Sequence, residues 1–169
     1  MQNASSGKGK AVIYHPPRQA DEAIIHFELA NLLSEDQTLA LNTRLGTLTL
    51  LTQDTASARP TVLVEQQFTS GEMNILLPLF QNHPHYCRYE VILASFNTGT
   101  VTEAAIERYR LRLQEAQFAG VWDYEMRTVR NVLSRARLKL RDFGLEISSI
   151  LETGYLLIAL PMRRVPRDI

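Results

Sequence analysis

Six cationic side chains and no acidic ones lie between residues 127 and 141, RTVRNVLSRARLKLR, in a chain with 18 cationic and 18 acidic residues in all. An arginine guanidinium is planar and donates paired hydrogen bonds, which suits phosphate and the edge of guanine. The alternative is a solvated helix face, but such faces usually mix both signs, because like charges one turn apart destabilise a helix. The segment therefore predicts a surface for an anionic partner, nucleic acid above all.

A helical projection divides this segment into two faces. At 100° per residue, the apolar side chains gather on one side and predict a helix over 127–141 that is anchored by that side. The anchoring residues are Val129, Val132, Leu133, Ala136 and Leu140. The opposite side carries Arg127, Arg130, Asn131, Ser134, Arg137 and Arg141, flanked by Thr128, Arg135 and Lys139. Leu138 is the one apolar residue expected on the polar side.

Other reactive side chains give weaker patterns. His83, His85 and Cys87 place three potential zinc ligands in one turn, but nothing in the sequence fixes the distance to a fourth, such as His15 or His26. A polar turn between helices is the favoured interpretation. The chain shows no glycine-rich phosphate loop and no convincing pair of carboxylates. We therefore expect no enzyme, no metal and no cofactor.

Composition sets limits on the class of protein. Zero net charge argues against a protein that coats nucleic acid through bulk charge, so any such site must be a local patch. A single cysteine excludes an intrachain disulfide and fits a reducing compartment. No apolar run is long enough to span a membrane. These features predict a cytoplasmic, nucleoid-associated protein without a membrane partner.

The first third of the chain reads as a short strand, a helix and a meander. Residues 1–10 are rich in Ser, Gly and Lys and predict a disordered tail. A strand at 11–14 and a helix at 21–34 would form an extension over 11–37. Three runs rich in Thr, Val and Leu then predict an antiparallel meander, at 38–43, 46–52 and 61–68.

The remainder predicts helices followed by a hairpin. Thr69 and Glu72 form a capping-box pattern, as do Thr100 and Glu103, and Pro78 should kink the first helix. A connector is expected at 118–125. The expected helices are 71–82, 87–96, 102–117 and 127–141, and the expected strands are 145–151 and 154–160, which turn around residues 152–154.

This order of elements is that of a winged helix-turn-helix, and residues 38–160 resemble the DNA-binding domain of OmpR-type response regulators. The family's recognition helix reads RTV-D-V-H-I-x-R-L-R-x-K-L and its wing ends G-x-G-Y, where this chain has RTVRNVLSRARLKL and ETGYLL. FTSGEMNILLPLFQNHP, CRYEVILASF and LGTLTLL are similar to the family's LT-x-x-E-x-x-LL, S-R-E-x-L-L and G-x-L-x-L segments. The resemblance implies an α+β fold with an N-terminal antiparallel meander, a helical core with one inserted helix, and a C-terminal hairpin wing. Residues 161–169, PMRRVPRDI, predict a basic tail from their composition.

The resemblance also implies a function, which is sequence-specific binding of double-stranded DNA in transcriptional regulation. Arg135 and Arg137 match an arginine pair that lies in the major groove, and Arg130 and Asn131 match positions that face base edges. Arg127, Thr128 and Ser149 match phosphate contacts, and Tyr155 matches a packing residue of the wing. The expected DNA-binding set is Arg127, Thr128, Arg130, Asn131, Ser134, Arg135, Arg137, Lys139, Arg141 and Ser149.

The chain also departs from the family. Leu151 stands where the family has a minor-groove arginine, and Glu152 stands where it has the first wing glycine. The helix 102–117 is inserted where the family's loop contacts RNA polymerase, so 97–125 is a candidate surface for RNA polymerase or a regulatory protein. The helices 21–34 and 102–117 are the candidates for a homodimer contact.

Two further expectations follow from these departures. Residues 1–37 are too few for a receiver domain, since domains rarely fall below about 50 residues, so any signal would arrive through a partner, a ligand or protein abundance. The alternative function is a winged-helix adaptor that binds an acidic protein and leaves DNA alone. Leu138, Leu151, Glu152 and the neutral net charge favour that alternative.

Overall fold

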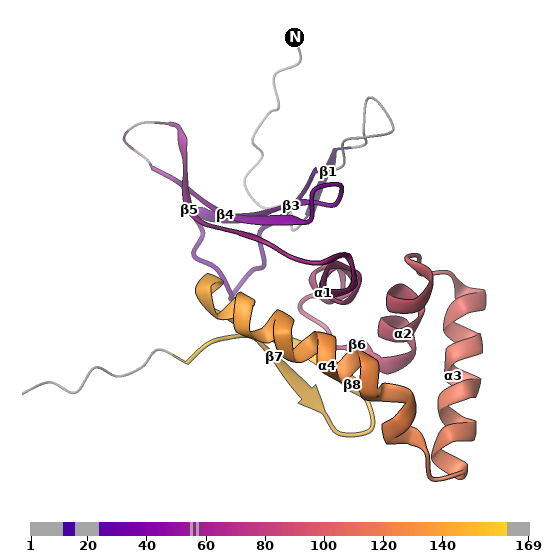
Figure 1. The fold of residues 1–169 in the computed structure, drawn as a ribbon. Coiled ribbons are helices and arrows are strands. Elements are labelled where there is room, and N and C mark those ends of the chain that lie inside the picture. The colour runs from indigo at the N-terminus through magenta and orange to yellow at the C-terminus, as the bar shows by residue number, and fades with distance from the viewer. Residues whose placement is uncertain (1–11, 16–23, 55, 57, 162–169) are drawn as a thin grey trace, which may run out of the picture.

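The computed structural model describes residues 12–15, 24–54, 56 and 58–161, and its ribbon is shown in Figure 1. The predicted tail 1–10 lies outside the described residues, as does the predicted basic tail apart from Pro161. Within the described part, the chain is a mixed α and β fold with two antiparallel sheets and four α-helices.

An antiparallel sheet opens the fold, with its strands hydrogen-bonded in chain order. The predicted meander and the predicted first strand are confirmed. The strands are β1 (Val12–His15), β2 (Ile24–Phe27), β3 (Gln37–Asn42), β4 (Thr47–Gln53) and β5 (Pro60–Gln67). Alternate residues of β3 and β4 are buried, as the period of two in a half-buried strand requires.

The predicted helix at 21–34 is wrong, because β2 occupies part of that segment. Ile25 and Phe27 are buried while Ile24 and His26 face outward more, so the period here is two and not 3.6. Leu29 and Asn31 then adopt φ angles of 44° and 69°, which no right-handed helix contains. The predicted extension therefore continues the meander as one sheet, since β2 pairs with β3.

Four α-helices follow the sheet. They are α1 (Ser70–Asn82), α2 (Tyr89–Thr98), α3 (Glu103–Phe118) and α4 (Trp122–Leu140). The predicted connector 118–125 is wrong in its second half, because α4 begins at Trp122. The predicted caps are present in part: Thr69 accepts from the backbone N–H of Glu72, but α3 is capped by Thr102 and not Thr100.

Pro78 lies inside α1 without ending it. A proline has no N–H to donate to the carbonyl four residues earlier, which here belongs to Asn74. The hydroxyl of Ser95, on α2, donates to that carbonyl instead. The hydrogen bond lost within one helix is therefore replaced from its neighbour, and Ser95 is buried at the contact between α1 and α2.

A second antiparallel sheet closes the chain, in the order β6-β8-β7. Its strands are β6 (Cys87–Arg88), β7 (Leu145–Ile150) and β8 (Gly154–Ala159). The predicted hairpin is confirmed. A 3-10 turn, η1 (Arg141–Phe143), separates α4 from β7, and Gly144 ends it at a φ of 72°, the left-handed conformation expected there.

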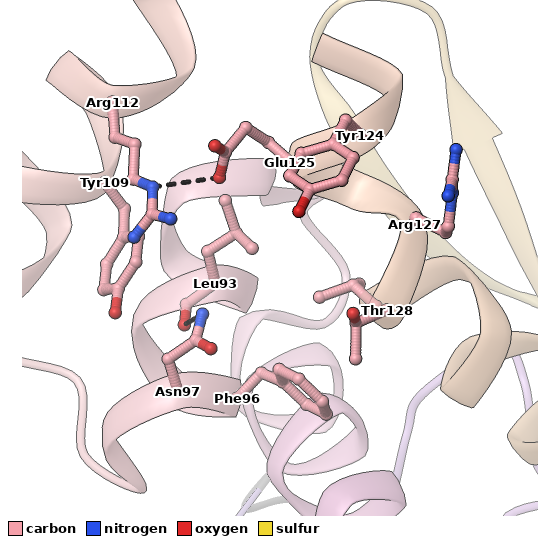
Figure 2. Close-up of a pocket in the computed structure, with 10 residues that line it drawn as sticks. Leu93, Phe96, Asn97, Tyr109, Arg112, Tyr124, Glu125, Arg127 and Thr128 are labelled. Atoms are coloured by element: carbon pink, nitrogen blue, oxygen red, sulfur yellow. Dashed lines mark hydrogen bonds and ion pairs between the residues drawn. The ribbon is translucent and has the colours of Figure 1, made fainter. Parts of the chain in front are cut away.

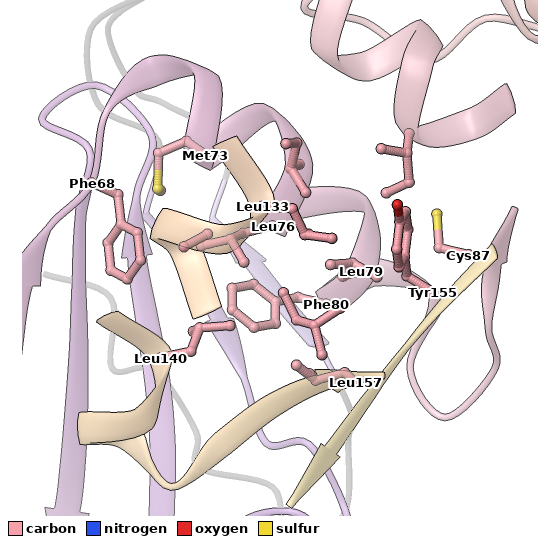
Figure 3. Close-up of a cluster of buried hydrophobic side chains, with 14 of the residues drawn as sticks. Phe68, Met73, Leu76, Leu79, Phe80, Cys87, Leu133, Leu140, Tyr155 and Leu157 are labelled. Atoms are coloured by element: carbon pink, nitrogen blue, oxygen red, sulfur yellow. The ribbon is translucent and has the colours of Figure 1, made fainter. Parts of the chain in front are cut away.

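The core fills the space between these layers. Figure 1 shows α1 between the five-stranded sheet and α4, with the hairpin β7–β8 on the far side of α4. Phe27 of the sheet contacts Phe80 of α1, with ring centroids 5.3 Å apart. Leu133 and Leu140 of α4 lie among the buried side chains of α1 and β8 (Figure 3). The position of α4 is thus fixed by one continuous apolar cluster.

Candidate nucleic-acid interface

The apolar face of α4 anchors the helix as predicted. Val129, Leu133, Ala136 and Leu140 are buried, Val132 is partly buried, and Met126 extends the face by one further turn. On the other side, Leu138 is 64% exposed, which confirms its predicted position. The helix therefore presents a fixed row of side chains to solvent.

Three of the predicted contact residues on the exposed side of α4 are open to a ligand. Arg127, Asn131 and Arg135 are exposed. Arg127 lies 5.7 Å from the ring centroid of Tyr124, which is itself exposed. Such a stacked guanidinium keeps its hydrogen-bond donors free, because the ring engages only its flat face. The described residues give Arg135 no hydrogen bond and no ion pair, so its charge is uncompensated.

Arg130 is held by the first turn of α4. It donates to Asp123 at 2.8 Å and lies 5.0 Å from the ring centroid of Trp122. The hydroxyl of Ser134 donates to the backbone carbonyl of Arg130 at 2.9 Å, so it is engaged within the helix. Because both charged partners are exposed, the ion pair is weak and open to exchange.

Arg137 connects α4 to the hairpin. Its guanidinium donates to the backbone carbonyl of Ile147 at 3.0 Å and to the hydroxyl of Ser149 at 3.2 Å. Glu146 lies 3.8 Å from Arg137 and 4.0 Å from Arg141. The acidic side chain thus offsets part of both charges, and Arg137 acts as a brace between the helix and β7.

Lys139 turns away from the exposed row. Its ammonium lies 2.9 Å from the carboxylate of Glu72, donates to the carbonyl of Gln67 at 3.2 Å and lies 5.1 Å from the ring centroid of Phe68. Glu72 is 2% exposed, so its charge depends on this lysine. The structure therefore places Lys139 in the core contact between α1 and α4, apart from the other predicted contact residues.

An aromatic cluster supports the N-terminal end of α4. The ring of Tyr89 makes edge contacts with Trp122 and Tyr155, each with centroids 5.2 Å apart, and its hydroxyl donates to the carbonyl of Ile150 at 2.9 Å. Burial raises the pKa of Tyr89 and of Tyr155, because the phenolate form would be desolvated. Trp122 and Tyr155 are thus packing residues here, which for Tyr155 agrees with the resemblance.

The tip of the hairpin carries an apolar and an acidic residue. Leu151 is 86% exposed. Glu152 has a φ of 55°, in the left-handed region where glycine is unstrained. Ser149 is exposed on β7 beside Arg137. The hairpin thus offers a hydroxyl close to α4 and no cation at its tip.

A shallow cavity lies beside the N-terminal half of α4. It has a volume of about 260 Å³, and its walls come from α2, α3 and α4. Figure 2 shows Arg112 and Glu125 joined across it at 2.9 Å, with Tyr124, Arg127 and Thr128 along the edge formed by α4. Thr128 therefore opens into this cavity as well as toward the exposed side of α4.

The turn with His83, His85 and Cys87 contains no assembled metal site. His83 contacts the carbonyl of Ala30 through its Nε2 at 2.9 Å, and Cys87 is buried. Across the residues that the structure describes, no group of three or more His, Cys, Asp or Glu side chains is placed to hold a metal ion. Likewise, no helix in that part of the chain has the length and apolarity to cross a membrane.

The Cys87 thiol should react slowly in the folded protein. Burial, and to a smaller extent Glu90, raises its pKa from 9.0 to about 12. Since the thiolate is the reactive form, a shift of this size lowers the reactive fraction at pH 8 by roughly 1,000-fold, and access lowers the rate further. The measurement is the rate of labelling by a thiol reagent with and without denaturant. Equal rates in the two conditions would contradict the buried position of Cys87.

The raised pKa of Cys87 also makes the stability of the protein depend on pH. Between pH 9 and about 12 the unfolded thiol ionises while the native one does not, so stability falls as the pH rises through this window. Both buried tyrosines act in the same direction, because their pKa values are also raised.

The residues missed from the sequence are acids that approach α4 from outside the cationic segment. They are Glu72 from α1, Asp123 from the first turn of α4 and Glu146 from β7. The pairing of Asp123 with Arg130 could have been predicted had the helix been extended to Trp122, because the two residues then lie on the same face about two helical turns apart. For Glu72 and Glu146 the contact depends on tertiary packing.

The chain matches no protein-family model, no curated protein and no solved structure.

Proposed function

We propose that this chain is a winged-helix protein that binds double-stranded DNA with sequence specificity and regulates transcription. In this proposal α4 enters the major groove and the hairpin β7–β8 acts as the wing. The observation that carries it is that α4 is anchored along one face and presents along the other the exposed Asn131 together with Arg127 and Arg135, two arginines without an ion pair among the described residues. An α-helix with its side chains is about 10–12 Å across, which matches a major groove about 12 Å wide.

The geometry suggests a role for eight of the ten predicted residues. Arg135 and Asn131 are the candidates for base edges, and Arg127, Thr128 and Ser149 are candidates for phosphates. Arg130 would have to break its ion pair with Asp123 before it could bind DNA. Arg137 would hold the wing against the helix. Lys139 is removed from the set, because it neutralises Glu72.

Few phosphates would be neutralised by so short a row of free cations. Each neutralised phosphate contributes about 0.9 to the slope of the logarithm of the affinity against the logarithm of the salt concentration. We therefore expect a modest slope and weak non-specific binding. A single winged module makes a small interface, so useful specificity would need a dimer or tandem sites. We also propose residues 97–125 as the surface for RNA polymerase or a regulatory protein.

Replacing Arg135 with alanine is expected to weaken binding to a selected site by about 1–3 kcal/mol and to relax specificity at one base pair. The measurement is selection of random duplex DNA on the purified chain, followed by titration of the enriched duplex at several salt concentrations. Arg44→Ala is the matched control, because Arg44 is an exposed arginine that lies in the turn between β3 and β4 and does not belong to α4. Enrichment of no motif, or equal losses in the two variants, would overturn the proposal.

A second candidate function is an adaptor that binds an acidic protein. The exposed Leu138 and Leu151 favour it, since exposed apolar side chains suit a protein surface better than a phosphate backbone. Under this alternative Leu138→Ser and Leu151→Ser would weaken binding to the partner, and random duplexes would enrich no motif. Under the DNA proposal Leu151→Ser leaves the selected motif unchanged.

A further inference from the structure

The outward face of α3 carries a regular apolar stripe. Ala104, Leu111 and Phe118 are spaced seven residues apart, and all three are exposed. Leu111 is 47% exposed and Phe118 is 97% exposed, although both are large apolar residues. The three residues of the stripe do not contribute to the core, because α3 packs inward through other side chains, including the buried Tyr109 and Leu113. In Figure 1 α3 is the outermost helix, on the far side of α2 from α1.

Polar residues flank this stripe on both sides, and their order would let one copy of α3 match the charges of a second, antiparallel copy. At 100° per residue, Arg108 and Glu115 lie on one side of Leu111, about 60° and 40° away. Glu107 and Gln114 lie on the other side at similar angles. Glu107 pairs with Arg110 in its own helix. Neither Arg108 nor Glu115 takes part in an ion pair among the described residues.

We propose that α3 pairs with α3 of a second copy, antiparallel, around a two-fold axis at Leu111. In this register residues whose numbers sum to about 222 face each other across the interface. Leu111 then meets Leu111, and the large Phe118 of one copy covers the small Ala104 of the other. A two-fold interface of this kind uses the same patch on both copies, which is the commonest arrangement in soluble oligomers.

The flanking charges fit this orientation. The antiparallel register sets Arg108 of one copy beside Glu115 of the other, twice, and sets Glu107 beside Gln114, twice. In a parallel pair Phe118 would meet Phe118 and Ala104 would meet Ala104, so large and small side chains would not complement each other across the interface as they do in the antiparallel pair.

The expected dimer is concentration-dependent. The paired helices are 16 residues long, about 24 Å, so the interface is at the small end of specific interfaces. This inference does not rest on DNA binding. It adds to that proposal, because residues 119–121 connect α3 directly to α4, and a dimer through α3 would carry two copies of α4 in one assembly.

The test is sedimentation equilibrium of the full chain from micromolar to the highest soluble concentration. The wild type should dimerise, and Leu111→Glu should weaken the dimer at least about tenfold, because two carboxylates would meet at the axis. Leu63→Glu is the matched control, since Leu63 is about as exposed but lies on the edge strand β5. Circular dichroism melting should show both variants folded.

A charge exchange tests the register itself. Arg108→Glu and Glu115→Arg should each weaken the dimer, and the double variant should recover it, because each residue then meets its opposite across the axis. In an oxidising buffer Leu111→Cys should also form a disulfide between two copies. A wild type that stays monomeric at every concentration would overturn the proposal. So would a dimer that is lost in Leu63→Glu and kept in Leu111→Glu.

Discussion

Replacing Lys139 with alanine is expected to lower the free energy of unfolding by about 2–4 kcal/mol. The substitution leaves the carboxylate of Glu72 buried without its cation, and Glu72 is only 2% exposed. The loss falls toward the lower end for a buried pair, because Lys139 keeps some contact with solvent and water can reach the site. Urea denaturation followed by circular dichroism measures the change.

A second substitution separates the loss of the charge pair from the loss of the side chain. In the double variant Glu72→Gln and Lys139→Met, no charge is left unpaired, so most of the stability should return. Arg135→Ala serves as the control on the same helix and should change stability by less than about 0.5 kcal/mol, since Arg135 is exposed. Equal losses for Lys139→Ala and Arg135→Ala would show that Lys139 does not neutralise Glu72.

Replacing Gly154 with alanine is expected to destabilise the protein by about 3 kcal/mol or more. A Cβ at this position would lie 2.0 Å from the carbonyl oxygen of Cys87 and 2.9 Å from the Cα of Arg88. Both are backbone atoms of β6, which cannot rotate aside as a side chain can. The pairing of β6 with β8, and with it the packing of Tyr155, would have to shift.

Gly99→Ala is the matched control for this substitution. Gly99 has a φ of 72° but no atom within 4 Å of an added Cβ, so only backbone strain of about 1 kcal/mol is expected. Thermal unfolding of the two variants compares the two costs directly. A loss for Gly154→Ala no greater than that for Gly99→Ala would show that β6 and β8 are not in close contact.

Much of the fold could be predicted from periodicity because its elements follow one strong pattern each. The apolar stripe of α4 is an example, since Val129, Leu133, Ala136 and Leu140 are each buried as the 100° projection predicts. The meander strands and the hairpin were likewise predicted, because the meander runs are rich in Thr, Val and Leu and the hairpin runs are rich in Leu and Ile.

The prediction failed where one short sequence satisfies two periods. In residues 24–34 the apolar positions fit a helix as well as a strand, and only the left-handed Leu29 and Asn31 exclude the helix. These two residues are neither glycine nor beside a proline, so no local signal marks the break. The pairing of β2 with β3, which the local sequence does not encode, decides the outcome.

The candidate site was predictable in its position but not in its net charge. The segment 127–141 contains no acid, yet Asp123, Glu146 and Glu72 contact four of its six cations. Two of these acids are distant from α4 in sequence or belong to another element, so no projection of the helix alone could include them. Within the part of the chain that the structure describes, Arg127 and Arg135 are the two cations of this segment without an acidic partner.

The short strand β6 also affects the order in which the chain folds. It joins Cys87 to Tyr155, so this sheet closes only after the whole helical region between them has been synthesised and brought together. The meander pairs strands that are neighbours in the chain. Because contacts between distant residues cost more loop entropy, we expect the meander to form early and the hairpin to join β6 last. The edge contact between Tyr89 and Tyr155, which supports the N-terminal end of the helix proposed to read DNA, would then form only in this final step.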